Sequence, residues 1–138
     1  MRFSRAQASH YPRITRPQPG VDYRVGEGAS SSVLAVARRY LGLGNVTGSH
    51  RPWCADFVNM VLRKTGHATS GSGMVGSMLH VGHRVSSPRP GDLVVMRGHV
   101  TIFAGYGPRG FVGLGGNQHH RVAMSNFPMR SVVAFVRP

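Results

Sequence analysis

Apolar positions follow a helical period in the first half of the chain and form short runs in the second half. Around the only cysteine, two sets recur every three or four residues and place apolar side chains on one side of a helix: Cys54, Phe57 and Val61, and Ala55, Val58 and Leu62. Residues 30–32 are serines, which favour helix N-caps, ahead of a second helical pattern that Gly42 or Gly44 should end. A third, short helix is expected over residues 75–81.

After Pro88 the chain consists of short apolar runs separated by turns rich in Gly and Pro. Such runs, bounded by turn residues, predict strands. We expect strands at residues 93–96, 99–104, 111–114, 121–124 and 132–136. Helices followed by about five short strands joined by tight turns predict a segregated α+β fold with an antiparallel sheet.

The length of 138 residues suits a single folded domain. Residues 1–28 differ from the rest, because they contain three prolines, five arginines and little apolar periodicity. This composition predicts an irregular basic N-terminal arm, followed by the folded domain at residues 29–138. The arm is open to two interpretations, a flexible tail or a dedicated binding segment.

Charge is the most unusual global feature. Seventeen basic residues against four acidic ones give a formal net charge of +13. This imbalance predicts attraction to polyanions such as nucleic acid, anionic lipid or an acidic cell-wall surface. The sequence has no zinc-finger spacing, basic heptad helix or basic-aromatic strand motif, so specific nucleic acid binding is not expected. No apolar run approaches the roughly 18 residues of a membrane span.

The cellular compartment is not fixed by the sequence. A single cysteine excludes an internal disulfide and leaves the redox environment open. No apolar stretch follows Arg2 and Arg5, so the N-terminus does not resemble a secretory signal. A protein that works outside the cytoplasm would then need another export route or a leader removed from this chain.

Cys54 is expected on the first turn of its helix, since Pro52 suits the turn that leads into one. A thiol at a helix N-terminus meets unpaired N–H groups and positive potential, which favour the thiolate and lower its pKa. The other interpretation of a lone cysteine in an apolar helix is a small buried hydrophobic residue.

A cysteine nucleophile needs a base and a group that orients the base. His99 is the best of eight histidines, because it opens a strand and its side chain therefore has a fixed direction. Asn117 ends the strand expected to pair with the His99 strand. The start of one antiparallel strand lies beside the end of the next, so Asn117 should lie next to His99.

The motifs along residues 29–138 resemble those of NlpC-type and CHAP cysteine peptidoglycan hydrolases, and most closely their small bacterial and phage-borne branch. The matching segments are Trp53-Cys54-Ala55, Pro90-Gly91-Asp92, Gly98-His99-Val100 and Gly115-Gly116-Asn117, in the family's order. The resemblance implies a papain-like fold, with the cysteine helix packed on the antiparallel sheet. It also implies hydrolysis of an amide bond in the peptide part of the bacterial cell wall, by an amidase or an endopeptidase.

Carried over by position, the resemblance makes Cys54 the nucleophile, His99 the general base and Asn117 the group that orients His99. Two positions depart from the family: Gly115 stands where many CHAP relatives have an acidic residue, and Trp53 where NlpC-type relatives often have aspartate. The Cys54 N–H is the expected oxyanion donor, and the remaining candidates for a second donor or a substrate contact are His50, Trp53 and Gln118. No cofactor is expected, and no metal either, since the pair His119-His120 has no further ligand at a suitable spacing.

A non-catalytic alternative follows from charge alone: a polyanion-binding protein on a hydrolase-like fold. The hydrolase interpretation places the protein in the periplasm, in the cell wall or outside the cell. It predicts a monomer with a peptidoglycan peptide as substrate, attracted to anionic surfaces and carried by a phage or a secretion assembly. Which amide bond is cut is not encoded in any motif.

Overall fold

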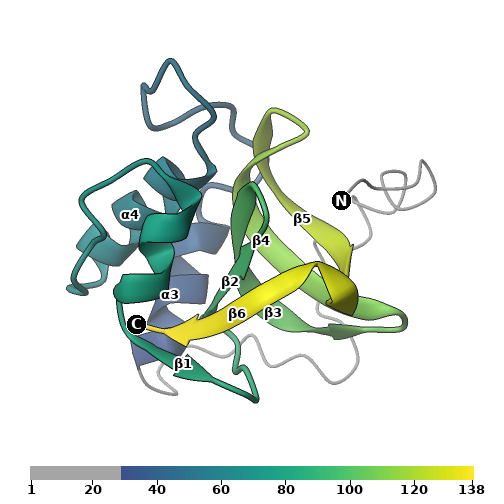
Figure 1. Ribbon diagram of the computed structural model, residues 1–138. Coiled ribbons are helices and arrows are strands. Elements are labelled where there is room, and N and C mark those ends of the chain that lie inside the picture. Colours follow the sequence, from purple (N-terminus) through teal and green to yellow (C-terminus); the bar gives the residue numbers. More distant parts are fainter. Residues whose placement is uncertain (1–28) are drawn as a thin grey trace.

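Three helical segments precede all six strands of the sheet in chain order (Figure 1). The computed structural model describes residues 29–138; the predicted basic arm, residues 1–28, lies outside the described residues. The helices are α3 (Ala29–Arg38), α4 (Cys54–Lys64) and the 3-10 helix η1 (Val75–His80). Helix α3 begins at Ala29, so the serines expected as caps lie in its first turn instead. It ends at Arg38, earlier than predicted, and a turn continues to Gly42, whose φ of 87° requires glycine.

The strands form one antiparallel sheet, which confirms the α+β prediction. They are β1 (His83–Val85), β2 (Leu93–Met96), β3 (His99–Gly107), β4 (Gly110–Gln118), β5 (Arg121–Pro128) and β6 (Val132–Arg137), in the order β1-β6-β2-β3-β4-β5. The sequence predicted about five strands and missed β1, whose mostly exposed residues show no apolar alternation. This strand exists because its backbone pairs with β6, with His83 opposite Arg137.

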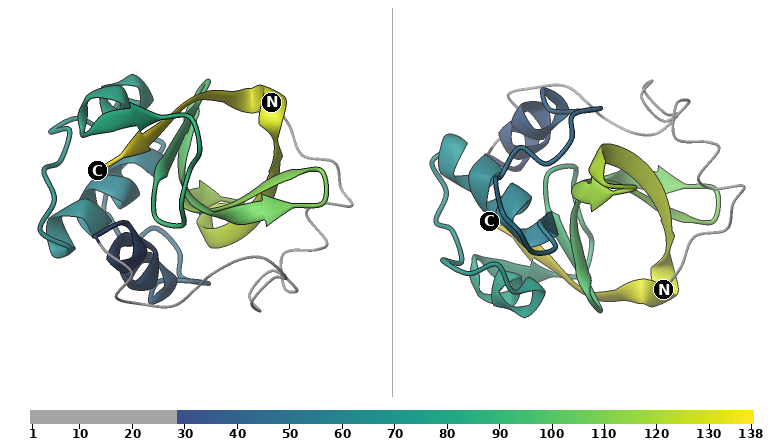
Figure 2. Two further views of the ribbon diagram at one scale, coloured as in Figure 1. Left: turned by 90° about the horizontal axis from the view of Figure 1, so that it is seen from below. Right: turned by 90° about the horizontal axis from the view of Figure 1, so that it is seen from above.

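The sheet curls strongly, and α3, α4 and η1 lie outside the curl (Figure 2). The short 3-10 helix η2 (Met129–Ser131) joins β5, at one edge of the sheet, to β6. The inside of the curl holds a small core that is mostly aromatic. Its buried members are Val94, Met96, Phe103, Phe111, Phe127 and Phe135.

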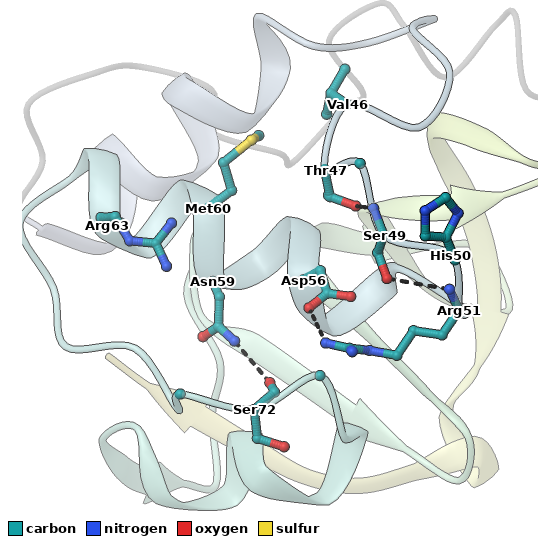
Figure 3. Close-up of a pocket in the computed structure, with 13 residues that line it drawn as sticks. Val46, Thr47, Ser49, His50, Arg51, Asp56, Asn59, Met60, Arg63 and Ser72 are labelled. Carbon is teal, nitrogen blue, oxygen red and sulfur yellow. Dashed lines mark hydrogen bonds and ion pairs between the residues drawn. The ribbon is translucent and has the colours of Figure 1, made fainter.

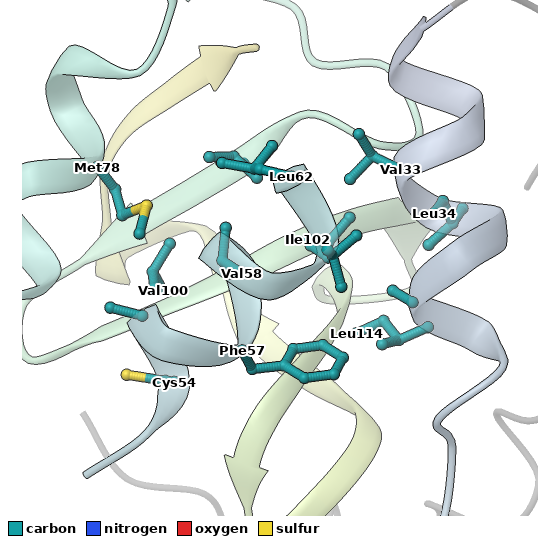
Figure 4. Close-up of a cluster of buried hydrophobic side chains, with 14 of the residues drawn as sticks. Val33, Leu34, Cys54, Phe57, Val58, Leu62, Met78, Val100, Ile102 and Leu114 are labelled. Carbon is teal, nitrogen blue, oxygen red and sulfur yellow. The ribbon is translucent and has the colours of Figure 1, made fainter. Parts of the chain in front are cut away.

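Helix α4 packs its apolar face on the outer side of the sheet, where the larger core lies (Figure 4). Seven of its eleven residues are buried, including Phe57, Val58 and Leu62, as the helical pattern predicted. Alternate residues of β3 face this core, namely Val100 and Ile102. Among the residues that the structure describes, no helix is long and apolar enough to cross a membrane.

A buried ion pair fastens β6 to the turn before β2. Asp92 is fully buried and accepts hydrogen bonds from Arg137 Nη2 at 2.7 Å and Nε at 3.0 Å. It also accepts the Arg89 N–H at 2.8 Å, which closes the turn. The carboxylate therefore fixes the strand entry and holds the last strand of the chain.

Candidate active site

Cys54 is the first residue of α4, as predicted. The first helical hydrogen bond runs from the Phe57 N–H to the Trp53 carbonyl at 2.9 Å, and no side chain caps this end of the helix. The N–H groups of Cys54 and Ala55 therefore precede the helical hydrogen-bond ladder. The cysteine side chain lies beside Val100 of β3, with only 3% of its surface exposed.

Burial raises the pKa of the Cys54 thiol above its ordinary value. The N–H groups of Val100, Ala55 and Cys54 itself lower this pKa, but their combined effect is smaller, and the nearby Asp56 carboxylate raises it further. The sequence-based expectation of a thiolate favoured by the helix N-terminus is therefore wrong for this structure. The cause is desolvation, which disfavours the charged form of a buried group.

His99 opens β3 and points its ring toward the inside of the curled sheet. The ring lies against Phe127, with the two ring centroids 5.7 Å apart. Burial lowers the pKa of His99 below its ordinary value, and a hydrogen bond with Gln118 partly offsets this effect. A histidine with a lowered pKa is neutral at pH 7, so one of its ring nitrogens is free to accept a proton.

The side chain that holds His99 is that of Gln118, whose Oε1 lies 3.0 Å from His99 Nε2. The orientation of this amide is fixed by its surroundings. Gln118 Nε2 donates to two backbone carbonyls, of Gly113 at 3.2 Å and Ala123 at 2.7 Å, and these can only accept. Gln118 Oε1 therefore faces His99 and accepts the proton on Nε2. This hydrogen bond leaves Nδ1 as the basic nitrogen of the neutral ring.

The strand register predicts Asn117 for this position, and the structure places Gln118 there. The pairing of β3 with β4 puts Ile102 opposite Leu114, and continuing that register would set His99 opposite Asn117. Pairing stops at Ile102, however, and Asn117 has a φ of 58°. The left-handed backbone turns the chain there, and the side chain of the next residue reaches the histidine. Within residues 29–138, the Asn117 side chain makes no hydrogen bond of its own.

Two glycines of β4 leave the space that Gln118 fills. A Cβ at Gly115 would lie 2.3 Å from Gln118 Oε1 and 2.7 Å from Thr101 Oγ1, and a Cβ at Gly113 would lie 2.4 Å from the Thr101 methyl group. Thr101 donates to the same Gln118 oxygen at 2.8 Å. The space that a side chain at Gly115 would take is therefore occupied by the amide of Gln118, three places later. This arrangement was not visible in the sequence.

Trp53 and His50 lie on different sides of α4. Trp53 is 6% exposed and packs on the backbone of Gly116, where a Cβ would lie 2.8 Å from its ring. This contact makes Trp53 a packing residue beside the cysteine. His50 is exposed and lines a groove on the far side of α4, and within residues 29–138 it makes no hydrogen bond with His99.

The arrangement brings a neutral thiol and a neutral imidazole to adjacent backbone positions, since Cys54 contacts the N–H of Val100 and His99 precedes it. Within residues 29–138, no hydrogen bond joins the thiol to the imidazole. Catalytic hydrogen bonds are often long before substrate binds and tighten only in the complex. Nucleophilic acyl transfer by such a pair requires His99 Nδ1 to reach the thiol proton during attack.

In the described part of the chain, no three His, Cys, Asp or Glu side chains are grouped to hold an ion. No protein-family model matches the chain, and no curated protein matches it either.

Proposed function

We propose that the protein is a cysteine peptidoglycan hydrolase of the papain-like NlpC and CHAP type, which cleaves an amide bond in the peptide part of the cell wall. The observation that carries the proposal is the hydrogen bond between His99 Nε2 and Gln118 Oε1, because it fixes the tautomer that a general base needs. The ordered motifs around Cys54, His99 and Asn117 support the same class of enzyme.

The reaction would start from the neutral pair. His99 Nδ1 takes the Cys54 proton as Sγ attacks the amide carbonyl, and the resulting oxyanion accepts a hydrogen bond from the Cys54 N–H. The protonated imidazole, held by Gln118, then gives its proton to the leaving amine, and a thioester remains on Cys54. Water attacks this thioester while His99 again takes a proton, which yields the free acid and restores the thiol.

The net charge of +13 supports action at an anionic surface such as the cell wall. To test the function, purified peptidoglycan is digested with the wild type or with Cys54→Ala, and soluble fragments are identified by mass spectrometry. The proposal expects new free amino and carboxyl ends with the wild type only. The fragment masses also name the bond: a muramoyl amide, or a link within the stem or cross-bridge.

One observation favours a second candidate, a non-catalytic polyanion-binding protein. The thiol is almost fully buried and its pKa is raised, as expected for a cysteine retained for packing. That candidate predicts salt-sensitive binding to DNA or anionic vesicles and no His99-dependent reactivity of Cys54. A rate of alkylation by iodoacetamide that falls on His99→Gln favours the enzyme, whereas an unchanged rate favours the binding protein.

A further inference from the structure

A groove with a volume of about 790 Å³ lies on the side of α4 that faces away from the sheet (Figure 3). Its walls are the loop of residues 46–51, the outward face of α4 and the segment 71–73. Small-molecule and cofactor sites commonly have volumes of roughly 300–1,000 Å³. Neither Cys54 nor His99 lines this groove, so its chemistry is separate from that of the candidate active site.

The wall formed by residues 70–73 is held in place before any ligand arrives. Asn59, 6% exposed, donates to the Ser72 carbonyl at 2.9 Å and to Ser70 Oγ at 3.1 Å. The same amide accepts the Ser70 N–H at 2.9 Å. A preformed wall lowers the entropic cost of binding, because little of it needs to be ordered.

Positive charge without a partner lies at one end of the groove. Asp56 and Asp92 are the only acids in residues 29–138, and they pair with Arg51 at 2.8 Å and with Arg137 at 2.7 Å. Within that part of the chain, Arg63 has no ion pair. Its guanidinium is therefore available to a carboxylate, for which the planar fork is well shaped.

A hydrogen-bond acceptor without a donor lies at the other end of the groove. Asp56 Oδ1 accepts from Arg51, but Asp56 Oδ2 is buried and has no hydrogen-bond partner within the described residues. A buried acceptor left unpaired costs free energy, which a ligand N–H would recover. A ligand that fits both ends of the groove would therefore carry an N–H donor near Asp56 and a carboxylate near Arg63.

The spacing of these two residues sets the length of that ligand. Seven residues of α-helix at roughly 1.5 Å each separate Asp56 from Arg63 by about 10 Å. An extended peptide advances at most roughly 3.3–3.6 Å per residue, so about three residues span the distance. We infer that the groove binds a short peptide of about three residues, with a backbone or amino N–H at Asp56 Oδ2 and a free carboxylate at Arg63.

The inference deepens the proposed function, on which its biological meaning rests. The Asp56 end of the groove adjoins the first turn of α4, where Cys54 stands. A cell-wall peptide held in the groove would therefore be anchored on the same helix as Cys54, whose thiol faces Val100 of β3. Binding itself needs no reaction, so the two proposals can fail separately.

The test uses the full chain with Cys54→Ala, labelled with ¹⁵N, and titrates it with trialanine, trialanine C-terminal amide and inorganic phosphate. Trialanine should shift the signals of Gly71, Gly73 and the Asn59 side-chain amide. The amide-capped peptide and phosphate should each bind at least about fivefold more weakly than the free acid. Equal affinity for acid and amide, tighter binding of phosphate, or no shifts with any probe would overturn the inference.

Variants of the same protein test which group of the peptide binds at each end of the groove. Arg63→Gln should weaken trialanine binding about tenfold and leave the amide-capped peptide unchanged, with Arg109→Gln, on the β3–β4 turn, as the matched control. Asp56→Ala should weaken both peptides more than Arg51→Ala, since both changes remove the ion pair but only the first removes the acceptor. Equal effects of the members of either pair would contradict the assignment. The protein could bind trialanine although the wild type does not cleave peptidoglycan. That outcome would support peptide binding in the groove and contradict the proposed hydrolase function.

Discussion

His99 Nε2 and Gln118 Oε1 lie 3.0 Å apart, and the Gln118 amide is itself held by the carbonyls of Gly113 and Ala123. This single contact decides which ring nitrogen of His99 can act as a base. It also places Gln118 beside His99, and not Asn117, which the strand register favoured.

Substituting Gln118 and Asn117 one at a time shows which of the two neighbouring side chains orients His99. Gln118→Ala should lower kcat about 10²-fold, because orienting partners of this kind are worth roughly 10–100-fold or more. It should also cost about 1–3 kcal/mol of unfolding free energy, since buried acceptors lose their donor. The control is Asn117→Gly, which keeps the positive φ and should change kcat less than about threefold. The reverse ranking in steady-state kinetics would restore Asn117 as the orienting residue.

A substitution at Gly115 tests whether the position of the Gln118 amide matters for activity. Gly115→Ala places a Cβ against Gln118 Oε1 and Thr101 Oγ1, so the amide must move away from His99. We expect at least a tenfold loss of kcat and a destabilisation of about 1–3 kcal/mol. Gly76→Ala is the matched control, because a Cβ there meets nothing within 4 Å. Full activity of Gly115→Ala would show that the position of Gln118 does not matter.

Activity should depend on pH through His99. The pKa of this imidazole is lowered by burial, so the neutral base persists below pH 6.5, its ordinary value. The acid limb of kcat/KM should therefore lie below pH 6.5. Placing a carboxylate beside the ring by Gln118→Glu should raise the pKa and move the limb to higher pH. A wild-type limb above pH 6.5, measured in kcat/KM profiles, would contradict the assignment.

Stability should fall on both sides of neutral pH. The folded His99 resists protonation, so as pH drops below 6.5 the unfolded chain takes up the proton first and stability is lost toward the lowered folded pKa. The folded Cys54 resists ionisation, so stability is lost as pH rises through its ordinary value of 9.0 toward the raised folded pKa. Urea unfolding at pH 5, 7 and 10 measures both. Relative to the wild type, Cys54→Ala should lose less stability between pH 7 and 10, and an equal loss would count against a buried thiol.

The ion pair of Asp92 with Arg137 should matter more than any surface arginine. Arg137→Gln leaves a fully buried carboxylate without its cation, which costs about 3–5 kcal/mol in comparable sites. Arg109→Gln, at an exposed turn position, should change unfolding free energy by less than about 0.5 kcal/mol. Similar urea midpoints for the two variants would show that the C-terminal strand is held by other contacts.

Local patterns were sufficient to predict much of this fold. The apolar faces of α4 and the turns around the strands predicted the helix start at Cys54, the strand start at His99 and the α+β class. The short strand β1 was missed because three residues without alternation become a strand only by pairing with β6.

Two features of the site depend on the three-dimensional structure and could not be predicted from the sequence. The helix start at Cys54 suggested a lowered pKa, but burial, which only packing determines, raises it. The strand register suggested Asn117, but the end of pairing and the left-handed turn at that residue bring Gln118 to His99.

The central claim is that Cys54 attacks a cell-wall amide with His99 as its base. The most direct measurement is the rate at which new amino groups appear in purified peptidoglycan, with wild type, Cys54→Ala and His99→Gln compared at equal concentration. The account predicts release by the wild type, none above background with Cys54→Ala, and at least a 10³-fold slower rate with His99→Gln, as for members of comparable catalytic groups. Equal release by the wild type and Cys54→Ala, or none by the wild type, would contradict it.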